Sequence, residues 1–211
     1  MRTQRRGRRP LLWASERRAR EMGYQVVAGI DEVGLGPLAG PAVAAAVVLP
    51  VGARLPGLDD SKRLTAVQRA ALDRLIRRRA VACSVFEVAP DSIDRHGLTR
   101  ARQMAMGGAV ERLAVPAEYL LVDAWDVPDL PLPQMCVVKG DGCCASIMAA
   151  SVVAKVHRDR LMIEYDRQFP GYGFAVHKGY ATAAHRRALR ELGPSPIHRM
   201  SWAPIRAVLA T

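Results

Sequence analysis

The sequence of 211 residues has no apolar run long enough to cross a membrane, because a spanning helix needs about 20 consecutive apolar residues. The N-terminal segment MRTQRRGRRPLLW also lacks the apolar stretch of a secretory signal, since the run LLW is too short. These two absences lead us to expect a cytoplasmic protein of the bacterial type.

Cysteine is scarce, and its spacing matches no metal or disulfide framework. The four cysteines are Cys83, Cys136, Cys143 and Cys144, and no pair has the Cys-x-x-Cys spacing of a zinc knuckle. Adjacent cysteines such as the last two do not easily form a disulfide with each other. We therefore interpret all four as small buried hydrophobic residues in a reducing compartment.

Lysine is scarce as well, although the chain is strongly basic. The net charge is +11 and the isoelectric point about 10.2, yet the only lysines are Lys62, Lys139, Lys155 and Lys178. A positive field of this size favours polyanionic partners such as nucleic acids. Because abundant arginine and alanine also reflect coding bias, the charge alone is a weak indicator, and the four lysines are the basic positions to locate.

The distribution of charge and hydrophobicity predicts one domain with a short basic extension. Half of the residues are hydrophobic, which allows a sizeable core. Residues 1–20 carry eight arginines and a single acid, Glu16, so we interpret them as a basic N-terminal arm followed by the start of a helix. A solvated tail and a nucleic-acid-binding arm are both open for this segment.

Apolar runs and helical segments together predict an α/β protein. Five strands are expected near residues 24–30, 41–50, 80–88, 119–123 and 135–139. The short glycine-rich connection between the first two favours an antiparallel pair. Helices are expected near residues 14–22, 65–80, 91–114, 144–169, 183–192 and 203–209. These elements predict a mixed five-stranded sheet flanked by helices, with a helical C-terminal region.

Three local signals refine this prediction. Thr65 and Gln68 have the spacing of a capping box, which marks the start of a helix. Gly97 is expected to divide the helix near residues 91–114 into two pieces. The glycine-containing segment 171–182 is expected to be a loop.

Acidic residues follow three of the apolar runs, at the point where each run ends. Asp31 and Glu32 follow VVAGI, Asp123 follows YLLV, and Asp141 lies in KGD after MCVV. Functional side chains are usually displayed at strand ends of α/β sheets. Carboxylates crowded there repel one another, and divalent cations relieve this repulsion. Carboxylate oxygens suit Mg²⁺ or Mn²⁺, and two such ions serve many nucleases and polymerases.

Each acid alone also has an ordinary structural explanation. Asp31 could cap a turn, Glu32 could form a surface ion pair, and Asp123 could simply end a strand. The four together, in a basic chain without a zinc pattern, favour a metal site. The glycine turn GLGPLAG does not match a dinucleotide-binding loop, because its spacing is G-x-G-x-x-x-G and a strand-like run follows it. Its glycines are better explained by close approach of a ligand or another backbone.

Five separated blocks of the chain resemble the ribonuclease HII family, in the order found in that family. The resemblance implies a ribonuclease H-like fold over residues 21–211, forming one catalytic domain that includes the C-terminal helices. It also implies divalent-metal-dependent hydrolysis of RNA in RNA–DNA hybrids and incision beside single ribonucleotides in duplex DNA. The matching blocks are GIDEVGLGPLAGPAVAAAVVL, LDDSKRL, YLLVDAW, VVKGDGCCASIMAASVVAKVHRD and FPGYGFAVHKGYATAAHRRALRELGPSPIHRMSW.

The resemblance assigns the same four carboxylates, Asp31, Glu32, Asp123 and Asp141, to catalysis and to binding of one or two Mg²⁺ or Mn²⁺ ions. In the two-ion mechanism, one ion activates the attacking water and the other stabilises the leaving 3′ oxygen. The products implied are a 3′-hydroxyl and a 5′-phosphate.

The resemblance also implies a set of substrate contacts. Tyr180, in HKGY, matches a tyrosine that packs on the sugar at the junction with DNA. Lys62 and Lys139 lie in matching loops and are expected to contact phosphates. Asp159 matches as well, and we interpret it as a partner of Arg158 or Lys155.

Two histidines complete the matching positions. They are His177 and His198, and structural and catalytic roles are both open for them.

The chain departs from the family in the turn after the acid pair. The family usually has Gly-Arg-Gly, and here the turn is Gly34-Leu35-Gly36. In the family, the backbone of this turn reads the ribose 2′-hydroxyl, the group that distinguishes RNA from DNA. Loss of an Arg–phosphate contact costs about 1.5–3 kcal/mol. We therefore expect an active enzyme with weaker substrate binding or looser junction selectivity.

Alternatives and partners follow from the same comparison. A non-catalytic protein that binds RNA–DNA hybrids is the main alternative, and an enzyme using a nucleotide cofactor is a third. The C-terminal segment PIRAVLAT lacks the glutamine-plus-aromatic peptide that docks on a sliding clamp, so we expect no such partner through the tail. The family implies a monomer.

Overall fold

The computed structural model describes residues 12–210, so most of the expected N-terminal arm lies outside the described residues. Helix α1 (Ala14–Glu21) forms where the sequence predicts a helix, and Ala19 on it is fully buried. The buried carboxylate of Glu16 accepts hydrogen bonds from the backbone N–H and the hydroxyl of Ser146, both at 2.8 Å. Helix α1 is therefore fixed to the body of the fold.

The sheet forms from runs of Val, Ala and Leu, which pack closely on both of its faces. Its strand order is β3-β2-β1-β4-β5, with β1 (Val27–Val33) at the centre between β2 (Ala42–Val48) and β4 (Tyr119–Asp123). The edges are β3 (Ala82–Val88) and β5 (Gln134–Val137). The five predicted strands are confirmed, with ends that differ by up to three residues.

The directions of the strands decide which strand ends lie side by side. The pairs β1–β2 and β2–β3 are antiparallel, as predicted for the first pair, whereas β1–β4 and β4–β5 are parallel. The carboxyl ends of β1, β4 and β5 therefore meet at one edge of the sheet. Ile30 pairs with Val122 in the register, so Asp31 and Asp123 follow as neighbours.

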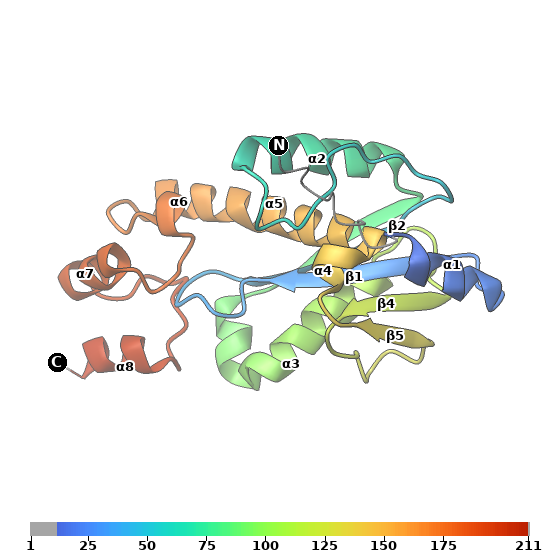
Figure 1. Ribbon diagram of the computed structural model, residues 1–211. Coiled ribbons are helices and arrows are strands. Elements are labelled where there is room, and N and C mark those ends of the chain that lie inside the picture. The colour runs from blue at the N-terminus through green and yellow to red at the C-terminus, as the bar shows by residue number, and fades with distance from the viewer. Residues whose placement is uncertain (1–11, 211) are drawn as a thin grey trace, which may run out of the picture.

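Helices cover both faces of the sheet (Figure 1). Helix α3 (Pro90–Glu111) packs on one face through Ala101, Ala105 and Met106. Helices α2 (Ala66–Arg79) and α5 (Ala145–Gln168) cover the other face. The capping box of Thr65 and Gln68 is confirmed, and Gly97 (φ 77°) does interrupt the helical geometry of α3.

The C-terminal helices lie beyond the end of β1, and the loop after β1 extends towards them (Figure 1). They are α6 (Phe174–His177), α7 (Ala183–Leu192) and α8 (Ala203–Leu209). The N–H of Leu38 donates to the carbonyl of Gly179 at 2.8 Å, which ties this loop to the segment between α6 and α7.

Two details differ from the expectation. The segment expected to be a loop near residues 171–182 contains α6, and the residues after β5 form another short helix, α4 (Gly140–Cys143). The prediction that all four cysteines are buried is wrong, because only Cys144 is buried and Cys136 is exposed. All four are free thiols. No helix in residues 12–210 has the length and apolar character needed to span a membrane.

Candidate active site

The four predicted carboxylates come from three neighbouring strand ends. Asp31 and Glu32 lie in the last half of β1, Asp123 is the last residue of β4, and Asp141 lies in α4 just after β5. The parallel arrangement of these strands brings the side chains to one edge of the sheet. Burial raises the pKa of Asp31 and of Asp123, and electrostatic repulsion between the acids adds to the rise.

Asp31 is the most deeply buried of the four, at 7% exposure. Its Oδ1 accepts the backbone N–H of Glu32 at 2.8 Å. Burial, Glu32 and Asp123 raise the pKa of Asp31 well above its usual value, and a hydrogen bond from Ser151 opposes the rise. The hydroxyl of Ser151 lies 2.9 Å from that of Ser61, so a buried pair of hydroxyls links Asp31 to the loop before α2.

Glu32 is held by a cation that the sequence reasoning missed. Its Oε1 accepts from Nε of Arg102, on α3, at 3.1 Å, and both side chains are largely buried. The other oxygen, Oε2, is buried without a hydrogen-bond partner. Burial raises the pKa of Glu32 despite Arg102. An unpartnered buried carboxylate oxygen is costly, so this atom is available to a ligand.

Asp123 and Asp141 are held by the loops around them. The Oδ1 of Asp123 accepts the backbone N–H of Gly140 at 2.8 Å, and burial and Asp141 raise the pKa of Asp123. The Oδ2 of Asp141 lies 2.8 Å from Nζ of Lys62, whose side chain is otherwise 79% exposed. This hydrogen bond raises the pKa of Lys62.

The four carboxylates suit divalent cations in charge and chemistry. Among residues 12–210, no three acidic, histidine or cysteine side chains are yet gathered closely enough to hold an ion between them. Glu32 and Asp141 pair instead with Arg102 and Lys62. The unpartnered oxygen of Glu32 and the raised pKa of Asp31 are the features that a bound cation would relieve. Asp141 would exchange Lys62 for a cation, which would leave the ammonium group free.

Two fully buried arginines hold the glycine turn and the loop that it contacts. Arg199 donates to the carbonyls of Gly34, of Leu35 (2.7 Å) and of Gly40 (2.9 Å). Arg158 donates in the same way to three other carbonyls at 3.0–3.1 Å, those of Pro41, Ala39 and Lys178. Neither arginine forms an ion pair with an acid among the described contacts. Their hydrogen bonds therefore fix the backbone of the turn.

The turn has one tightly packed glycine and one open glycine. Gly34 has φ 86°, and a Cβ there would overlap the side chain of Arg158. Gly36 is exposed, and the nearest atom to a Cβ there would be Cε1 of Tyr180, at 3.9 Å. The fold itself does not require glycine at this second position, which is consistent with close approach of a ligand. Leu35 is partly buried and packs against the core cluster under α3.

Backbone strain is concentrated around the site. The described non-glycine residues with positive φ are Ala124 (60°), Lys139 (56°) and Lys178 (53°). The first follows Asp123 directly, and the other two precede Asp141 and Tyr180 by two residues. Such conformations are sparsely populated and are often found at functional sites.

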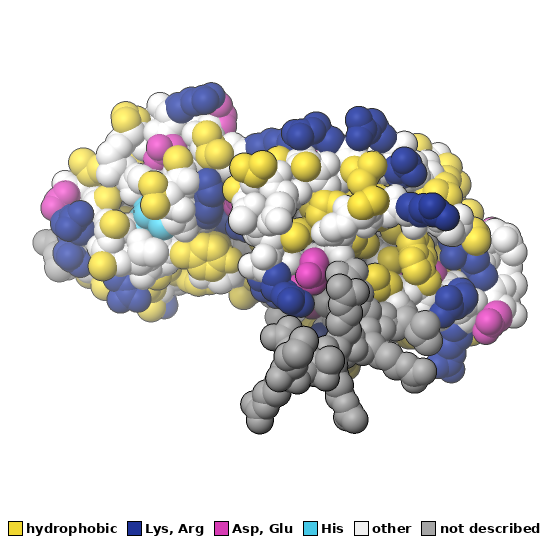
Figure 2. Space-filling model, turned by 45° about the horizontal axis from the view of Figure 1, so that its top comes forward, with side chains coloured by type: hydrophobic (Ala, Val, Ile, Leu, Met, Phe, Trp, Pro, Cys, Tyr) yellow, Lys and Arg dark blue, Asp and Glu magenta, His cyan; other side chains and the backbone are white. Residues whose placement is uncertain are grey.

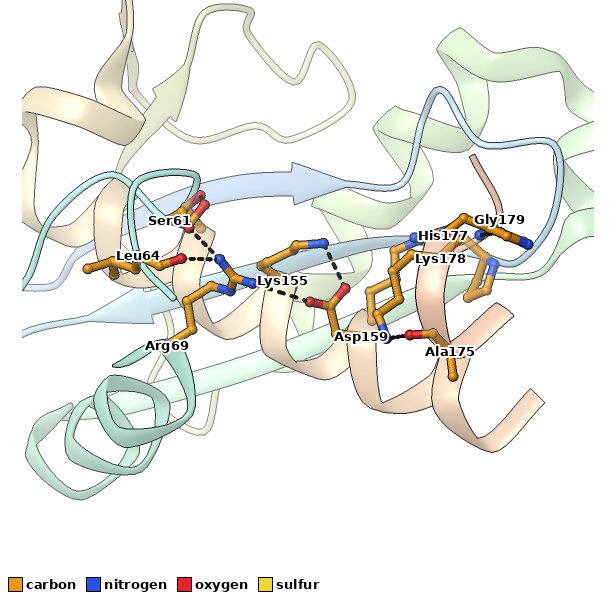
Figure 3. A network of polar contacts seen from close by, with 12 residues as sticks. Ser61, Leu64, Arg69, Lys155, Asp159, Ala175, His177, Lys178 and Gly179 are labelled. Carbon is orange, nitrogen blue, oxygen red and sulfur yellow. Dashed lines mark hydrogen bonds and ion pairs between the residues drawn. The ribbon is translucent and has the colours of Figure 1, made fainter. Parts of the chain in front are cut away.

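A polar network along α5 joins the loop before α2 to this helix (Figure 3). Arg69 donates to the carbonyls of Ser61 and Leu64, and it also lies 3.8 Å from Asp159. Asp159 pairs with Lys155 at 2.7 Å, so of the two partners predicted for it Lys155 is the one observed. The network holds the loop that carries Lys62.

A network of three buried histidines holds the backbone of Tyr180. Ser195 N–H donates to Nδ1 of His198 at 2.8 Å, so Nε2 of His198 carries the proton and donates to Nε2 of His185 at 3.0 Å. Nδ1 of His185 then donates to the carbonyl of Tyr180 at 2.9 Å. His177 stacks on His185, with ring centroids 4.3 Å apart, and accepts the N–H of Gly179. The hydrogen bonds assign neutral rings.

Protonation of His198 is expected to destabilise the fold at acidic pH. Burial and His185 lower the pKa of His198 to about 4. The unfolded chain binds the proton near pH 6.5, so this contribution is complete above that pH and is lost as the pH falls towards 4. Between pH 7 and 5, His198 should account for a loss of about 2 kcal/mol in unfolding free energy. Urea denaturation at pH 7 and at pH 5 measures this loss in unfolding free energy.

His198→Gln and the exposed His96→Gln are the matched variants for this measurement. The glutamine amide can replace both hydrogen bonds of His198, but it does not titrate. The loss of stability between pH 7 and 5 should shrink in His198→Gln and stay unchanged in His96→Gln. Equal losses in both variants and the wild type would contradict the account.

The charged side chains on one face of the molecule are mostly basic. On the face shown in Figure 2, Lys and Arg side chains outnumber those of Asp and Glu. Such a surface attracts the phosphate backbone of a nucleic acid.

Comparison with known proteins identifies close relatives of the chain. The family described as Ribonuclease HII matches residues 28–205. A ribonuclease HII of Geobacter sulfurreducens is 52% identical over 197 residues, which are 93% of this chain and 91% of that protein. One of Geobacillus kaustophilus is 54% identical over 194 residues, 92% of this chain and 74% of that protein.

Solved structures share the fold. The ribonuclease H2 of Pyrococcus horikoshii superposes with a TM-score of 0.75 at 26% identity, covering 87% of this chain and 97% of that one. The RNase HII of Archaeoglobus fulgidus, solved in complex with PCNA, gives 0.72 at 28% identity, covering 86% and 96%. A Bst-RNase HIII in complex with Mn²⁺ gives 0.70 at 20% identity, covering 91% and 71%, and this match bears on the fold alone.

Proposed function

The chain belongs to the ribonuclease HII family, and we propose that it incises duplex DNA on the 5′ side of a single embedded ribonucleotide and hydrolyses the RNA strand of RNA–DNA hybrids. It is an endonuclease of the ribonuclease H type, with the predicted α/β fold. We further propose that it acts in the cytoplasm, in ribonucleotide excision repair and DNA replication, and that residues 21–211 form the catalytic domain.

One observation carries the mechanism: Asp31, Glu32, Asp123 and Asp141 lie at one sheet edge with a buried, unpartnered oxygen on Glu32. These residues would hold one or two Mg²⁺ or Mn²⁺ ions. Such ions, when bound, activate a water and stabilise the leaving 3′ oxygen, which yields a 3′-hydroxyl and a 5′-phosphate. Ser151 and Arg102 keep Asp31 and Glu32 in position for this role.

The other residues of the site bind and orient the substrate in this proposal. Lys62, once released from Asp141, and Lys139 contact phosphates as compact charges. The backbone of Gly34-Leu35-Gly36 reads the 2′-hydroxyl, and Arg199 fixes that backbone beforehand. Tyr180, half exposed beside Gly36, packs on the sugar of the next nucleotide.

A non-catalytic protein that binds RNA–DNA hybrids is the second candidate, because Leu35 replaces the usual arginine. The retained carboxylates weigh against it. Burial and mutual repulsion raise the pKa of Asp31, so keeping this acid costs stability that a mere binding protein need not lose. A nucleotide-cofactor enzyme would need a helix after Gly36, whereas β2 follows.

Turnover on defined duplexes tests the proposal. Three labelled substrates are compared in Mg²⁺ and in Mn²⁺: DNA with one ribonucleotide, an RNA–DNA hybrid, and all-DNA of the same sequence. We expect incision of the first two substrates and none of the third. The nick in the single-ribonucleotide duplex should carry a 3′-hydroxyl and a 5′-phosphate, which a DNA ligase can rejoin. Binding of the first two without any incision would support the second candidate instead.

Replacing Leu35 by arginine is expected to strengthen substrate binding. A charge-assisted phosphate contact contributes about 1.5–3 kcal/mol, so the Michaelis constant should fall about tenfold or more and junction selectivity should rise. Because Leu35 packs against the core, the variant should also lose some stability. Leu35→Met, which keeps the apolar contact, is the control. An unchanged Michaelis constant and selectivity in Leu35→Arg would contradict this reading.

We propose a monomer that has no sliding-clamp contact through its tail, although the Archaeoglobus relative was solved with PCNA. The tail of this chain forms α8, whose Ile205 is fully buried.

A further inference from the structure

An exposed indole lies next to the carboxylates and is not explained by the fold. Trp125 follows Asp123 by two residues, and its side chain is 70% exposed. A tryptophan gains little in this position, since its large apolar surface is better buried. Its backbone is nevertheless held firmly: the N–H of Trp125 donates to the carbonyl of Asp123 at 2.7 Å and closes a tight turn around Ala124, which has φ 60°.

Arg102 connects this turn to the catalytic carboxylates. Its guanidinium donates to the carbonyl of Trp125 at 3.2 Å and to that of Asp123 at 3.4 Å. The same group pairs with Glu32 at 3.1 Å. One buried side chain therefore fixes the position of the tryptophan backbone relative to the acid pair.

The neighbouring loop extends the apolar surface. The N–H of Ala124 donates to the carbonyl of Val137 at 3.2 Å, which joins the loop after β4 to the end of β5. Val138, the first residue after β5, is 76% exposed, and Lys139 follows it with a left-handed backbone. Trp125 and Val138 are therefore exposed apolar residues on two backbone segments joined by a hydrogen bond, and we refer to these two residues as the patch.

The position of the patch indicates what it contacts. Tyr180 lies by the turn after β1, whereas Trp125 and Val138 follow β4 and β5, so the two exposed aromatic residues lie near the ends of different strands that carry the carboxylates. A nucleic-acid strand that crosses the carboxylates would meet both. Because the bases of a paired duplex already stack on each other, the apolar surface open to an indole beside the duplex is the sugar.

We propose that Trp125, together with Val138, is a substrate-positioning platform that packs on a sugar of the nucleic-acid strand on the β5 side of the cleavage position. Lys139 contacts the adjacent phosphate. The patch thereby fixes the strand on one side of the scissile bond while Tyr180 fixes it on the other. This inference rests on the proposed function, because it takes the same duplex as its ligand.

The test measures binding and turnover separately. A fluorescein-labelled DNA duplex with one ribonucleotide is titrated with the full-length protein in buffer containing chelator, and Kd is read from anisotropy. Trp125→Ala should raise Kd about tenfold, because the apolar burial of the indole against the sugar is lost. Trp125→Phe should stay within about threefold of the wild type. At saturating substrate and Mg²⁺, kcat of Trp125→Ala should stay within about twofold, because no catalytic group is removed.

Val67→Ala is the matched control, since Val67 is 80% exposed on α2. It should bind the duplex as the wild type does, and melting temperatures should be equal in all variants. A Kd for Trp125→Ala equal to that of the wild type would overturn the platform while leaving the proposed function intact. Failure of the wild type to bind or incise any ribonucleotide-containing duplex would overturn the proposed function, and the platform with it.

Discussion

Asp31→Asn is expected to lower kcat on a ribonucleotide-containing duplex by at least about a thousandfold. The proposed metal site contributes several kcal/mol of transition-state stabilisation, and about 1.4 kcal/mol corresponds to each factor of ten. Asp31 is the most buried of the four acids, and burial and Glu32 raise its pKa well above its usual range. Steady-state incision in Mg²⁺ measures the loss.

The same substitution is expected to make the metal-free protein more stable. Because the pKa of Asp31 is higher in the folded state, the unfolded chain loses this proton at a lower pH than the folded protein does. The free energy of unfolding therefore falls as the pH rises through this range. Asparagine removes that charge and can still accept from Ser151. A gain of 1 kcal/mol corresponds to about 2–4 °C in melting temperature for a domain of this size. Thermal denaturation in chelator at pH 7.5 measures it.

Asp126→Asn is the matched control, since this acid is exposed and lies just beyond the site. It should leave kcat and melting temperature within error of the wild type. Lost activity accompanied by lost stability in Asp31→Asn would show that the residue is structural and would contradict the account.

Arg199→Met is expected to lower the melting temperature by about 10 °C. The variant leaves the carbonyls of Gly34, Leu35 and Gly40 without their donor inside the protein. Each buried acceptor without a partner costs about 1–3 kcal/mol, so the total is about 3 kcal/mol or more. Burial lowers the pKa of Arg199 to about 9, and the side chain is therefore still charged at neutral pH. These hydrogen bonds offset the cost of burying that charge.

Activity should fall with stability in this variant, because the turn that reads the substrate loses its support. Differential scanning calorimetry and incision below the new melting temperature measure the two effects. Arg206→Met, at an exposed position on α8, is the control and should change neither quantity. An Arg199→Met protein with the wild-type melting temperature would show that the turn holds without the guanidinium.

The acidic positions could be predicted from the sequence for a simple physical reason. Asp31 and Asp123 directly follow an apolar run and Asp141 lies shortly after another, and the parallel pairing of β1, β4 and β5 brings their carboxyl ends to one edge of the sheet. The capping box at Thr65 and the break at Gly97 were predicted in the same way, from local chemistry. In each of these cases, the residues that determine the local structure lie close together in the sequence.

The groups that hold these acids could not be predicted, because their partners are far away along the chain. Arg102 is one of many arginines, and only the packing of α3 on the sheet brings it to Glu32. Arg199 reaches the glycine turn from the C-terminal region. Ser151 did carry a signal, as a polar residue within a buried apolar helix, and such a residue needs a partner. Cys136 was predicted to be buried, but it lies exposed on an edge strand.

Metal-dependent incision of a single-ribonucleotide duplex is the measurement that tests the central claim most directly. The labelled duplex is incubated with the wild type and with Asp123→Asn, in Mg²⁺ or Mn²⁺ and in chelator. The account predicts a cut on the 5′ side of the ribonucleotide in either metal, and no cut in chelator or with Asp123→Asn. Incision that persists in chelator or in the variant, or tight binding without incision by the wild type, would contradict it.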